Sequence, residues 1–147
     1  ELNEMVMSSA KGEKFITFFV AHYDAVSRKM SYVNAGHNHP FLTNGKTVKD
    51  LDQGTIGLGM LDELPFINIG DVVLSPNTTM VLYTDGVVEL ENESEEFFGS
   101  ERLVKLVNNY YPLGMNDMNS LIFSKLDEWK GKLDLVDDTA IFSCRFF

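Results

Sequence analysis

Residues 81–90 of the chain read VLYTDGVVEL. The residues from Thr79 to Leu82 have the apolar, β-branched character of a buried strand, and Val87-Val88 resume it. Asp85-Gly86 interrupts this pattern with an acid and a residue that has no side chain. Asp and Gly are common in tight turns for conformational reasons, so a turn is the simplest interpretation of the pair alone. An acid at the end of a core strand is also a candidate ligand-binding residue.

A second acidic pair, Asp137-Asp138, precedes another apolar strand at 139–147. In an antiparallel pair of strands, the end of one strand lies beside the start of its neighbour. If these two strands are neighbours, the carboxylates of Asp85 and Asp137 meet at one edge of the sheet. Like charges placed together are unfavourable unless a cation lies between them. Taken alone, Asp137-Asp138 is equally well explained as a polar strand entry.

Oxygen ligands without cysteine or paired histidine favour magnesium or manganese over zinc or copper. Gly86 would let backbone and water approach such an ion, because it has no side chain. These residues therefore predict part of a Mg²⁺ or Mn²⁺ site, with the tight turn as the alternative.

The rest of the chain alternates strand patterns with turn signals before it turns helical. The segment 14–24 is dense in β-formers and predicts a strand buried on both faces. Asn44-Gly45 is a strong signal for a two-residue hairpin turn. Further strands are expected at 30–36, 40–44, 47–51, 66–74 and 78–84.

Helical patterns occupy the C-terminal third. Ser100 resembles an N-cap, the following helix ends at Pro112, and a second helix is expected over 117–130. Residues 1–7 resemble the end of a helix. The acidic segment 89–100 has no clear helix or strand pattern, and we expect it to be the least ordered part of the chain. Strands followed by helices predict an α+β fold that is mostly antiparallel, in a single domain over 1–147.

Composition excludes several classes of protein. The chain has 147 residues and a formal net charge of −10, from 22 acids and 12 bases. Nucleic acid and anionic membrane are therefore not expected as partners, since phosphate binding needs clustered Lys and Arg. The single cysteine excludes an internal disulfide, and no apolar run is long enough to cross a bilayer. A reduced, cytoplasmic setting is expected.

Five motifs recur in the order of a known family over nearly the whole chain. The chain resembles the C-terminal part of a metal-dependent protein phosphatase (PPM) of the 2C type, within the bacterial branch of sporulation stage II protein E and the stress-sigma regulator phosphatases. The motifs are YVNAGHNHPFL (32–42), the Leu-Gly at Leu58, VLYTDGVVEL (81–90), FFGSERL (97–103) and DDTAIF (137–142).

The resemblance implies a β-sandwich flanked by helices, with two Mn²⁺ or Mg²⁺ ions that activate water against a phosphoserine or phosphothreonine. Carried over by motif, Asp85 and Asp137 would be metal ligands, and through metal-bound water they would be the catalytic groups. Asp138, Gly86 and Asn38 would lie around these ligands and hold water or neighbouring groups in place.

One family motif is missing from the chain. Gly-Asp-Val-x-Gly-His-Gly supplies a bridging Asp in the family, and only Gly70-Asp71-Val72 resembles it here. The residues that follow, Val73-Leu74-Ser75, do not supply the Gly-His-Gly of the motif, so we interpret Asp71 as an exposed strand residue. We therefore expect a truncated C-terminal portion of the domain, with half of a metal site, weak metal binding and no phosphatase activity of its own.

The resemblance also implies a signalling role. The parent protein is expected to act on a phosphorylated regulator, with an anti-anti-sigma factor as one candidate, as the output module of a larger sensor. A non-catalytic module that binds a partner protein is the alternative, and a small calcium-binding or structural β-domain is a third. Missing N-terminal strands would leave a sheet edge unpaired, which favours a homodimer through that edge.

Overall fold

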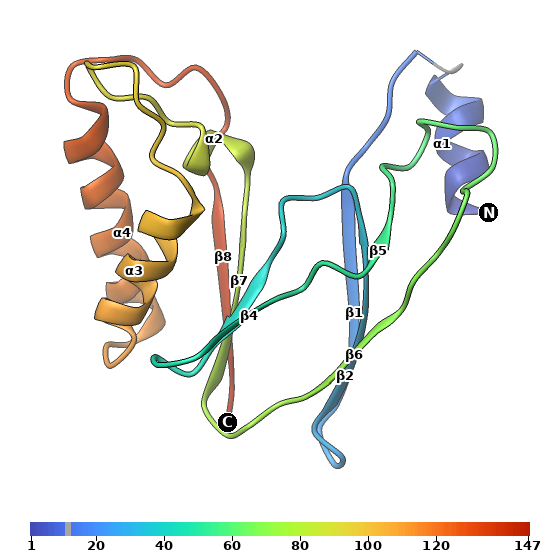
Figure 1. Cartoon of the computed structure of the whole chain (residues 1–147), viewed down its shortest axis with the longest axis horizontal. Coiled ribbons are helices and arrows are strands. Elements are labelled where there is room, and N and C mark those ends of the chain that lie inside the picture. The colour runs from blue at the N-terminus through green and yellow to red at the C-terminus, as the bar shows by residue number, and fades with distance from the viewer. Residues whose placement is uncertain (11–12) are drawn as a thin grey trace. The chain divides into compact units, whose positions relative to one another are not determined.

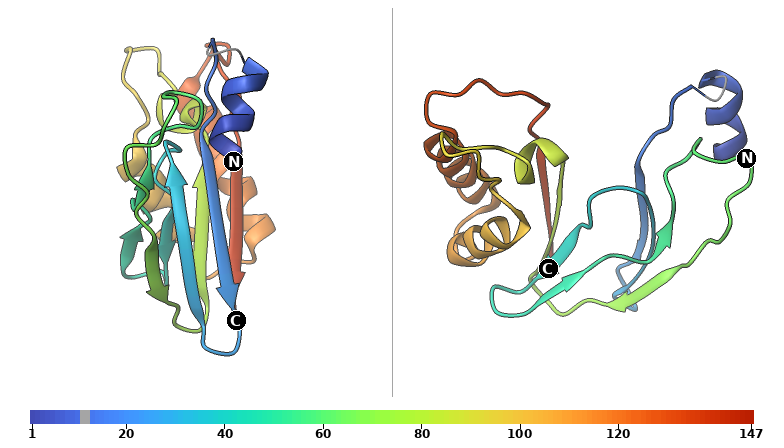
Figure 2. Two further views of the ribbon diagram at one scale, coloured as in Figure 1. Left: turned by 90° about the vertical axis from the view of Figure 1, so that its right-hand side faces the viewer. Right: turned by 45° about the horizontal axis from the view of Figure 1, so that its top comes forward.

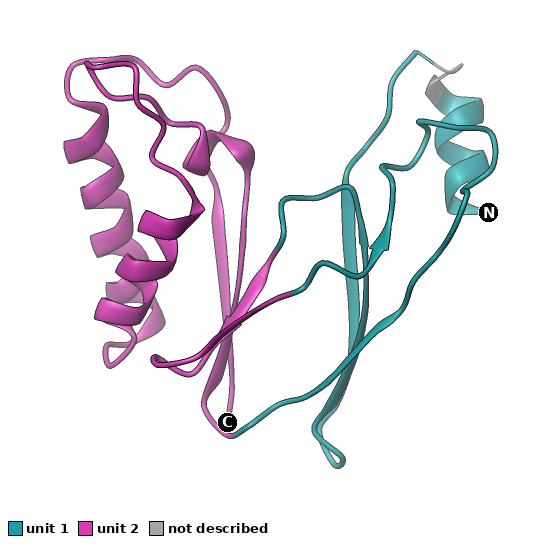
Figure 3. Cartoon of the chain, in the orientation of Figure 1, with its two compact units in different colours: residues 1–39, 51–75 teal, residues 40–50, 76–147 magenta. Residues whose placement is uncertain are grey.

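The computed structural model describes residues 1–10 and 13–147, and it divides the chain into two compact units (Figure 3). The first unit holds residues 1–39 and 51–75, and the second holds residues 40–50 and 76–147. The chain therefore passes between the units after His39, Asp50 and Ser75.

The first unit is a sheet built around β2, with helix α1 near one end of the unit (Figure 1). Strand β2 pairs antiparallel with β1 and β6 and parallel with β5. The elements of this unit are α1 (Leu2–Ala10), β1 (Phe18–Asp24), β2 (Lys29–Ala35), β5 (Gly54–Thr55) and β6 (Gly70–Val73). The expected hairpin of the first two strands and the N-terminal helix are confirmed. The strand expected over 66–74 is confined to β6.

One prediction about strand β1 is wrong. It was expected to be buried on both faces, yet most of its residues are exposed, with Phe18 at 38% and Val20 at 48%. The cause is its place in the sheet, because β1 pairs only with β2 and is an edge strand. Local β-propensity does not distinguish an edge strand from a central one.

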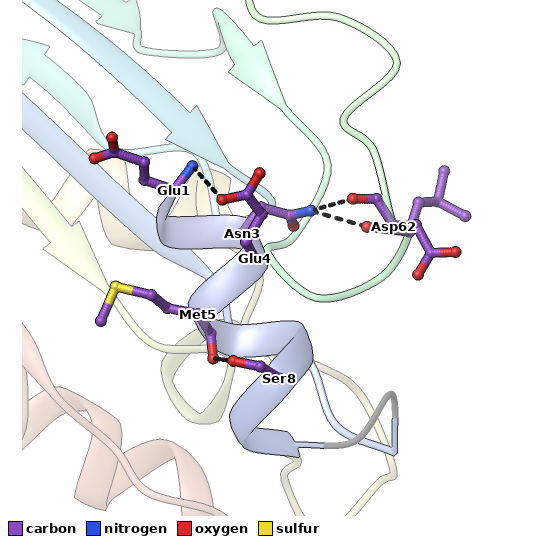
Figure 4. A network of polar contacts seen from close by, with 7 residues as sticks. Glu1, Asn3, Glu4, Met5, Ser8 and Asp62 are labelled. Carbon is purple, nitrogen blue, oxygen red and sulfur yellow. Dashed lines mark hydrogen bonds and ion pairs between the residues drawn. The ribbon is translucent and has the colours of Figure 1, made fainter.

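Asn3 attaches helix α1 to a distant loop of the same unit (Figure 4). Its side-chain amide donates to the carbonyls of Leu61 at 2.9 Å and Asp62 at 3.1 Å. Its side-chain oxygen accepts from the backbone N–H of Gly59 at 2.8 Å. Asn3 is only 8% exposed, so these three bonds satisfy a buried polar side chain.

The second unit is a four-stranded antiparallel sheet in the order β4-β3-β7-β8. Helices α3 and α4 lie side by side on one side of the β7–β8 pair (Figures 1 and 2). The elements of this unit are β3 (Phe41–Thr43), β4 (Val48–Asp50), β7 (Thr78–Tyr83), α2 (Asp85–Val88), α3 (Ser100–Tyr110), α4 (Met115–Lys130) and β8 (Ile141–Phe146).

One hydrophobic core joins this sheet to its helices. The sheet contributes Phe41, Val81 and Tyr83, and the helices contribute residues that recur at the 3.6-residue spacing of a helix, including Leu103, Val107, Met118, Ile122 and Leu126. Burial raises the pKa of Tyr83, and the carboxylate of Asp50 adds to this shift.

Two local expectations in the second unit are wrong. Gly99, not Ser100, is the N-cap of α3, and its φ of 78° is in the left-handed region that favours glycine. The acidic segment is an ordered hairpin rather than an irregular one. Phe98 N–H donates to Leu90 O at 2.8 Å, and the side-chain oxygen of Asn92 accepts from the backbone N–H of Ser94 at 2.9 Å.

The described residues thus form an α+β fold with two mostly antiparallel sheets, which confirms the predicted class. No helix among them is both long enough and apolar enough to cross a bilayer.

Candidate metal centre

Strands β7 and β8 are antiparallel neighbours, as the candidate site requires. Tyr83, the last residue of β7, is paired with Ile141, the first residue of β8. The residues after β7 and the residues before β8 therefore lie at the same edge of the sheet. Asp85 comes from the first group, and Asp137 and Asp138 come from the second.

Two threonines hold these segments together beyond the strands. The backbone N–H of Thr84 donates to Ala140 O at 3.1 Å, and Ala140 N–H donates to Thr84 Oγ1 at 2.9 Å. Thr84 Oγ1 in turn donates to Asp138 O at 2.7 Å. Thr139 Oγ1 donates to Gly86 O at 3.2 Å. Sequence reasoning missed both threonines, because they look like ordinary strand residues.

Asp85-Gly86 is neither a turn nor a break within one long strand. It begins α2, a single helical turn in which Glu89 N–H donates to Asp85 O at 2.8 Å. Gly86 is required for packing against Asp138. A Cβ built on Gly86 would lie 2.6 Å from the Asp138 carbonyl oxygen, which is closer than any side chain tolerates. The glycine therefore permits the close approach of two backbones.

The acidic side chains at this edge are exposed to solvent. Asp85 Oδ1 accepts from Gly86 N–H at 3.1 Å, and Asp137 Oδ1 accepts from Asp138 N–H at 2.7 Å. Each carboxylate keeps a second oxygen for which the structure records no hydrogen bond. Exposed carboxylates are suitable hard donors for Mg²⁺ or Mn²⁺.

The fit to a metal ion is partial. In residues 1–10 and 13–147, no group of three or more His, Cys, Asp or Glu side chains is arranged to hold a metal ion. The sheet edge supplies hard oxygen donors from Asp85 and Asp137, and a complete site needs further ligands.

Two further residues considered for the metal site, Asn38 and Asp71, belong to the first unit. Asn38 is half-buried and belongs to the first unit, whereas Asp85 and Asp137 belong to the second, so its role stays a prediction. Asp71 is an exposed residue of β6, as predicted. Its carboxylate accepts from Ser31 Oγ and pairs with Lys29 at 3.0 Å, and these contacts lower its pKa.

The guanidinium of Arg145 is held by contacts within the fold. Its guanidinium donates to Thr79 Oγ1 at 2.8 Å and to Tyr111 O at 2.9 Å, and it lies over the Tyr111 ring at 4.3 Å. It links β8 to β7 and to the segment that joins α3 and α4.

A groove of about 580 Å³ opens beside the acids. Its walls include Gly86 and Asp137 from the site itself. Apart from Thr139, the other lining residues are acidic or apolar, and no Lys or Arg is among them. They include Glu89, Glu91, Asp134, Phe97, Leu133, Leu135 and Val136. The groove thus combines negative charge with an apolar wall at the same end of the sheet.

The sequence profile of the stage II sporulation protein E (SpoIIE) family matches residues 1–147. The chain belongs to the SpoIIE family. Protein IcfG of Synechocystis sp. is 33% identical over 92 residues, which cover 62% of this chain and 14% of that protein.

Solved structures agree on the fold of this SpoIIE-family chain. The SiaA-PP2C domain of Pseudomonas aeruginosa is 24% identical with a TM-score of 0.73, over 82% of this chain and 48% of that one. The RsbU and RsbW domains of Rv1364c from Mycobacterium tuberculosis are 20% identical with a TM-score of 0.77, over 97% of this chain and 39% of that one. The chain thus spans less than half of either structure.

Proposed function

We propose that this chain is part of a Mn²⁺- or Mg²⁺-dependent phosphatase that hydrolyses phosphoserine or phosphothreonine on a regulatory protein. The observation that carries the proposal is the β7–β8 register, which brings Asp85 and Asp137 to one sheet edge in a chain of the SpoIIE family. A structure of the Bacillus subtilis SpoIIE phosphatase domain presoaked with Mn, 15% identical with a TM-score of 0.61, supports this choice of ion.

Asp85 and Asp137 would hold the metal, and the metal would supply an activated water and neutralise phosphoryl oxygens. Thr84 and Thr139 fix the spacing of the two acidic segments through their hydroxyl contacts. Asp138 contributes its carbonyl to this arrangement, and Gly86 allows the two backbones to approach.

The substrate proposed for this site is a phosphorylated regulatory protein in the cytoplasm. Support comes from the names of related structures, which include SiaA and an RsbU domain. Within this class, we propose an anti-anti-sigma factor as the substrate. The acidic and apolar groove beside Asp137 would receive the chain that flanks the phosphorylated residue.

The chain by itself is proposed to bind metal weakly and to lack turnover, since two carboxylates are fewer ligands than such an ion needs. The absence of a three-ligand group among the described residues also favours a second candidate, a phosphatase-like module that binds a partner without catalysis.

Manganese titration followed by nuclear magnetic resonance tests the site directly. We expect Mn²⁺ to broaden the amide signals of Gly86 and Asp138 before others, and Asp85→Asn or Asp137→Asn to remove this selectivity. Asp117→Asn and Asp127→Asn, which change exposed acids on α4, are the matched controls. Broadening that is unselective, or equal in all four variants, would contradict a metal site at this edge.

Turnover of p-nitrophenyl phosphate separates the two candidates. We expect none from this chain, and Mn²⁺-dependent turnover from a longer form of the protein if that form carries the Gly-Asp-Val-x-Gly-His-Gly motif. Selective Mn²⁺ binding with no turnover in that longer protein would favour the non-catalytic module.

A further inference from the structure

A second groove, formed by α3, α4 and the residue before the N-cap of α3, lies within the second unit. It has a volume of about 450 Å³ and is lined by Phe98, Arg102, Lys105, Leu106, Lys125, Glu128 and Trp129. We call it the helix groove. Its lining shares no residue with the groove beside Asp137. This volume falls within the roughly 300–1,000 Å³ range of clefts that bind ligands.

An aromatic pair forms the apolar part of the helix groove. Phe98 and Trp129 meet edge to face, with their ring centroids 5.7 Å apart. The indole N–H of Trp129 donates to Leu90 O at 3.1 Å, which fixes the ring. Leu106, from α3, adds an aliphatic side chain to this surface. Phe98 is only 3% exposed, so the surface open to a large apolar side chain comes from Trp129 and Leu106.

Positive charge surrounds this apolar surface. Arg102 lies over the Trp129 ring at 4.4 Å, and its guanidinium donates to the carbonyls of Phe97 and Phe98. Lys125 pairs with Glu128 at 2.6 Å. For the exposed Lys105, the structure records no ion pair or hydrogen bond with any of the described residues.

The balance of charge in the helix groove is opposite to that of the whole chain. Three cations and one acid give the groove a charge of +2, in a chain with a net charge of −10. Positive patches on an acidic protein attract acidic partners at short range, whereas the rest of the surface repels extended polyanions. This favours a short acidic segment over nucleic acid or an anionic membrane.

We propose that the helix groove docks an acidic segment of a partner protein, with one large apolar side chain against Trp129 and Leu106 and carboxylates beside Lys105 and Lys125. This surface is independent of the proposed phosphatase site, because it needs no metal ion and no phosphoryl group. Loss of Mn²⁺ binding through Asp85→Asn would therefore leave docking unchanged.

The single tryptophan of the chain makes the test specific, since Trp129 lines the groove. The probe is a synthetic peptide with one central Phe and three Asp or Glu on either side of it. We expect it to shift Trp129 fluorescence in a saturable way, with a Kd on the order of 100 μM for so small a contact. A peptide with Ser in place of Phe, and one with Ser in place of every acid, should each bind at least about fivefold more weakly.

Charge reversal in the protein completes the test. We expect Lys105→Glu combined with Lys125→Glu to weaken binding of the acidic peptide about fivefold or more, because two ion pairs become repulsive contacts. Lys46→Glu combined with Lys49→Glu is the matched control, since it reverses two exposed lysines elsewhere in the same unit. Circular dichroism would confirm that both variants stay folded.

Three outcomes would overturn the proposal. They are a peptide that produces no fluorescence change, equal weakening by both double variants, and a Trp129 blue shift with phosphatidylserine vesicles in the absence of any response to the peptide. The last of these would assign the groove to a membrane surface instead.

Discussion

Gly86 lies where two backbone segments touch at the edge of the β7–β8 pair. A Cβ at this position would stand 2.6 Å from Asp138 O and 3.0 Å from Asp138 C. Both contacts are with backbone, so no side-chain rotation can relieve them. The residue is therefore constrained by packing whether or not a metal ion binds.

We expect Gly86→Ser to destabilise the second unit by about 1–3 kcal/mol, because the overpacked segment must move. Gly114→Ser is the matched control. Gly114 is the N-cap of α4, has nothing within 4 Å of its built Cβ and makes no side-chain cap bond, so serine should stabilise by a few tenths of a kcal/mol. Urea unfolding followed by Trp129 fluorescence measures both, and equal effects would refute the packing argument.

At the scale of single residues, the sequence predicted that Asp85 and Asp137 flank neighbouring strands and missed the contacts that join these segments. Asp85 and Asp137 stood out because each interrupts or precedes an apolar strand. Thr84 and Thr139 did not, since threonine is common in strands and its hydroxyl partner depends on the neighbouring chain. The packing role of Gly86 was not predicted either, because its close contact with Asp138 joins residues far apart in sequence and exists only in the folded chain.

Strand β1 is the element whose surroundings differ most from expectation. It pairs only with β2, and Phe18 and Val20 on it are exposed. An unpaired edge with apolar side chains is a template for another strand. The exposed edge of β1 is therefore a candidate surface for the homodimer that the sequence predicts.

We expect the protein to self-associate with rising concentration, and Val20→Lys to weaken this association at least about threefold, because an edge lysine opposes strand pairing. Val26→Lys is the matched control, since Val26 is 96% exposed in the turn after β1. Sedimentation velocity over a concentration series measures the effect. A protein that stays monomeric throughout, or variants that behave alike, would exclude dimerisation through β1.

Helices and central strands were predicted more closely than edges and caps. Leu103, Val107, Met118 and Ile122 recur at the 3.6-residue spacing of a helix and lie in the core, because helix packing follows that period. The cap of α3 was placed one residue late, since Ser100 is a good cap by type but Gly99 has the required backbone. The order of the acidic hairpin depends on Asn92, whose turn contacts composition does not reveal.

Across the whole chain, the two units are interleaved in sequence, and the last strand of the second unit is also the last element of the chain. Strand β8 covers one side of β7 through six paired positions. Arg145 adds contacts to Thr79 and Tyr111. The single domain expected from the sequence stays a prediction, because periodicity alone does not show how the chain is shared between units.

We expect deletion of residues 141–147 to prevent folding of the second unit, because β7 loses its neighbour and the core loses one side. Deletion of Phe147 alone, which follows β8 and is 80% exposed, is the control and should be tolerated. Trp129 lies in the second unit and reports its folding through fluorescence and near-ultraviolet circular dichroism. Native-like spectra of the longer deletion would contradict this dependence.

The late position of β8 has a consequence during synthesis on the ribosome. The bond between Arg145 and Thr79 joins residues 66 positions apart, so β7 leaves the exit tunnel long before its partner exists. Through that interval α3 and α4 can form, since their contacts are local, while β7 waits with one hydrogen-bonding edge bare. A nascent chain stalled before residue 141 would therefore be a natural client for a chaperone that shields strand edges.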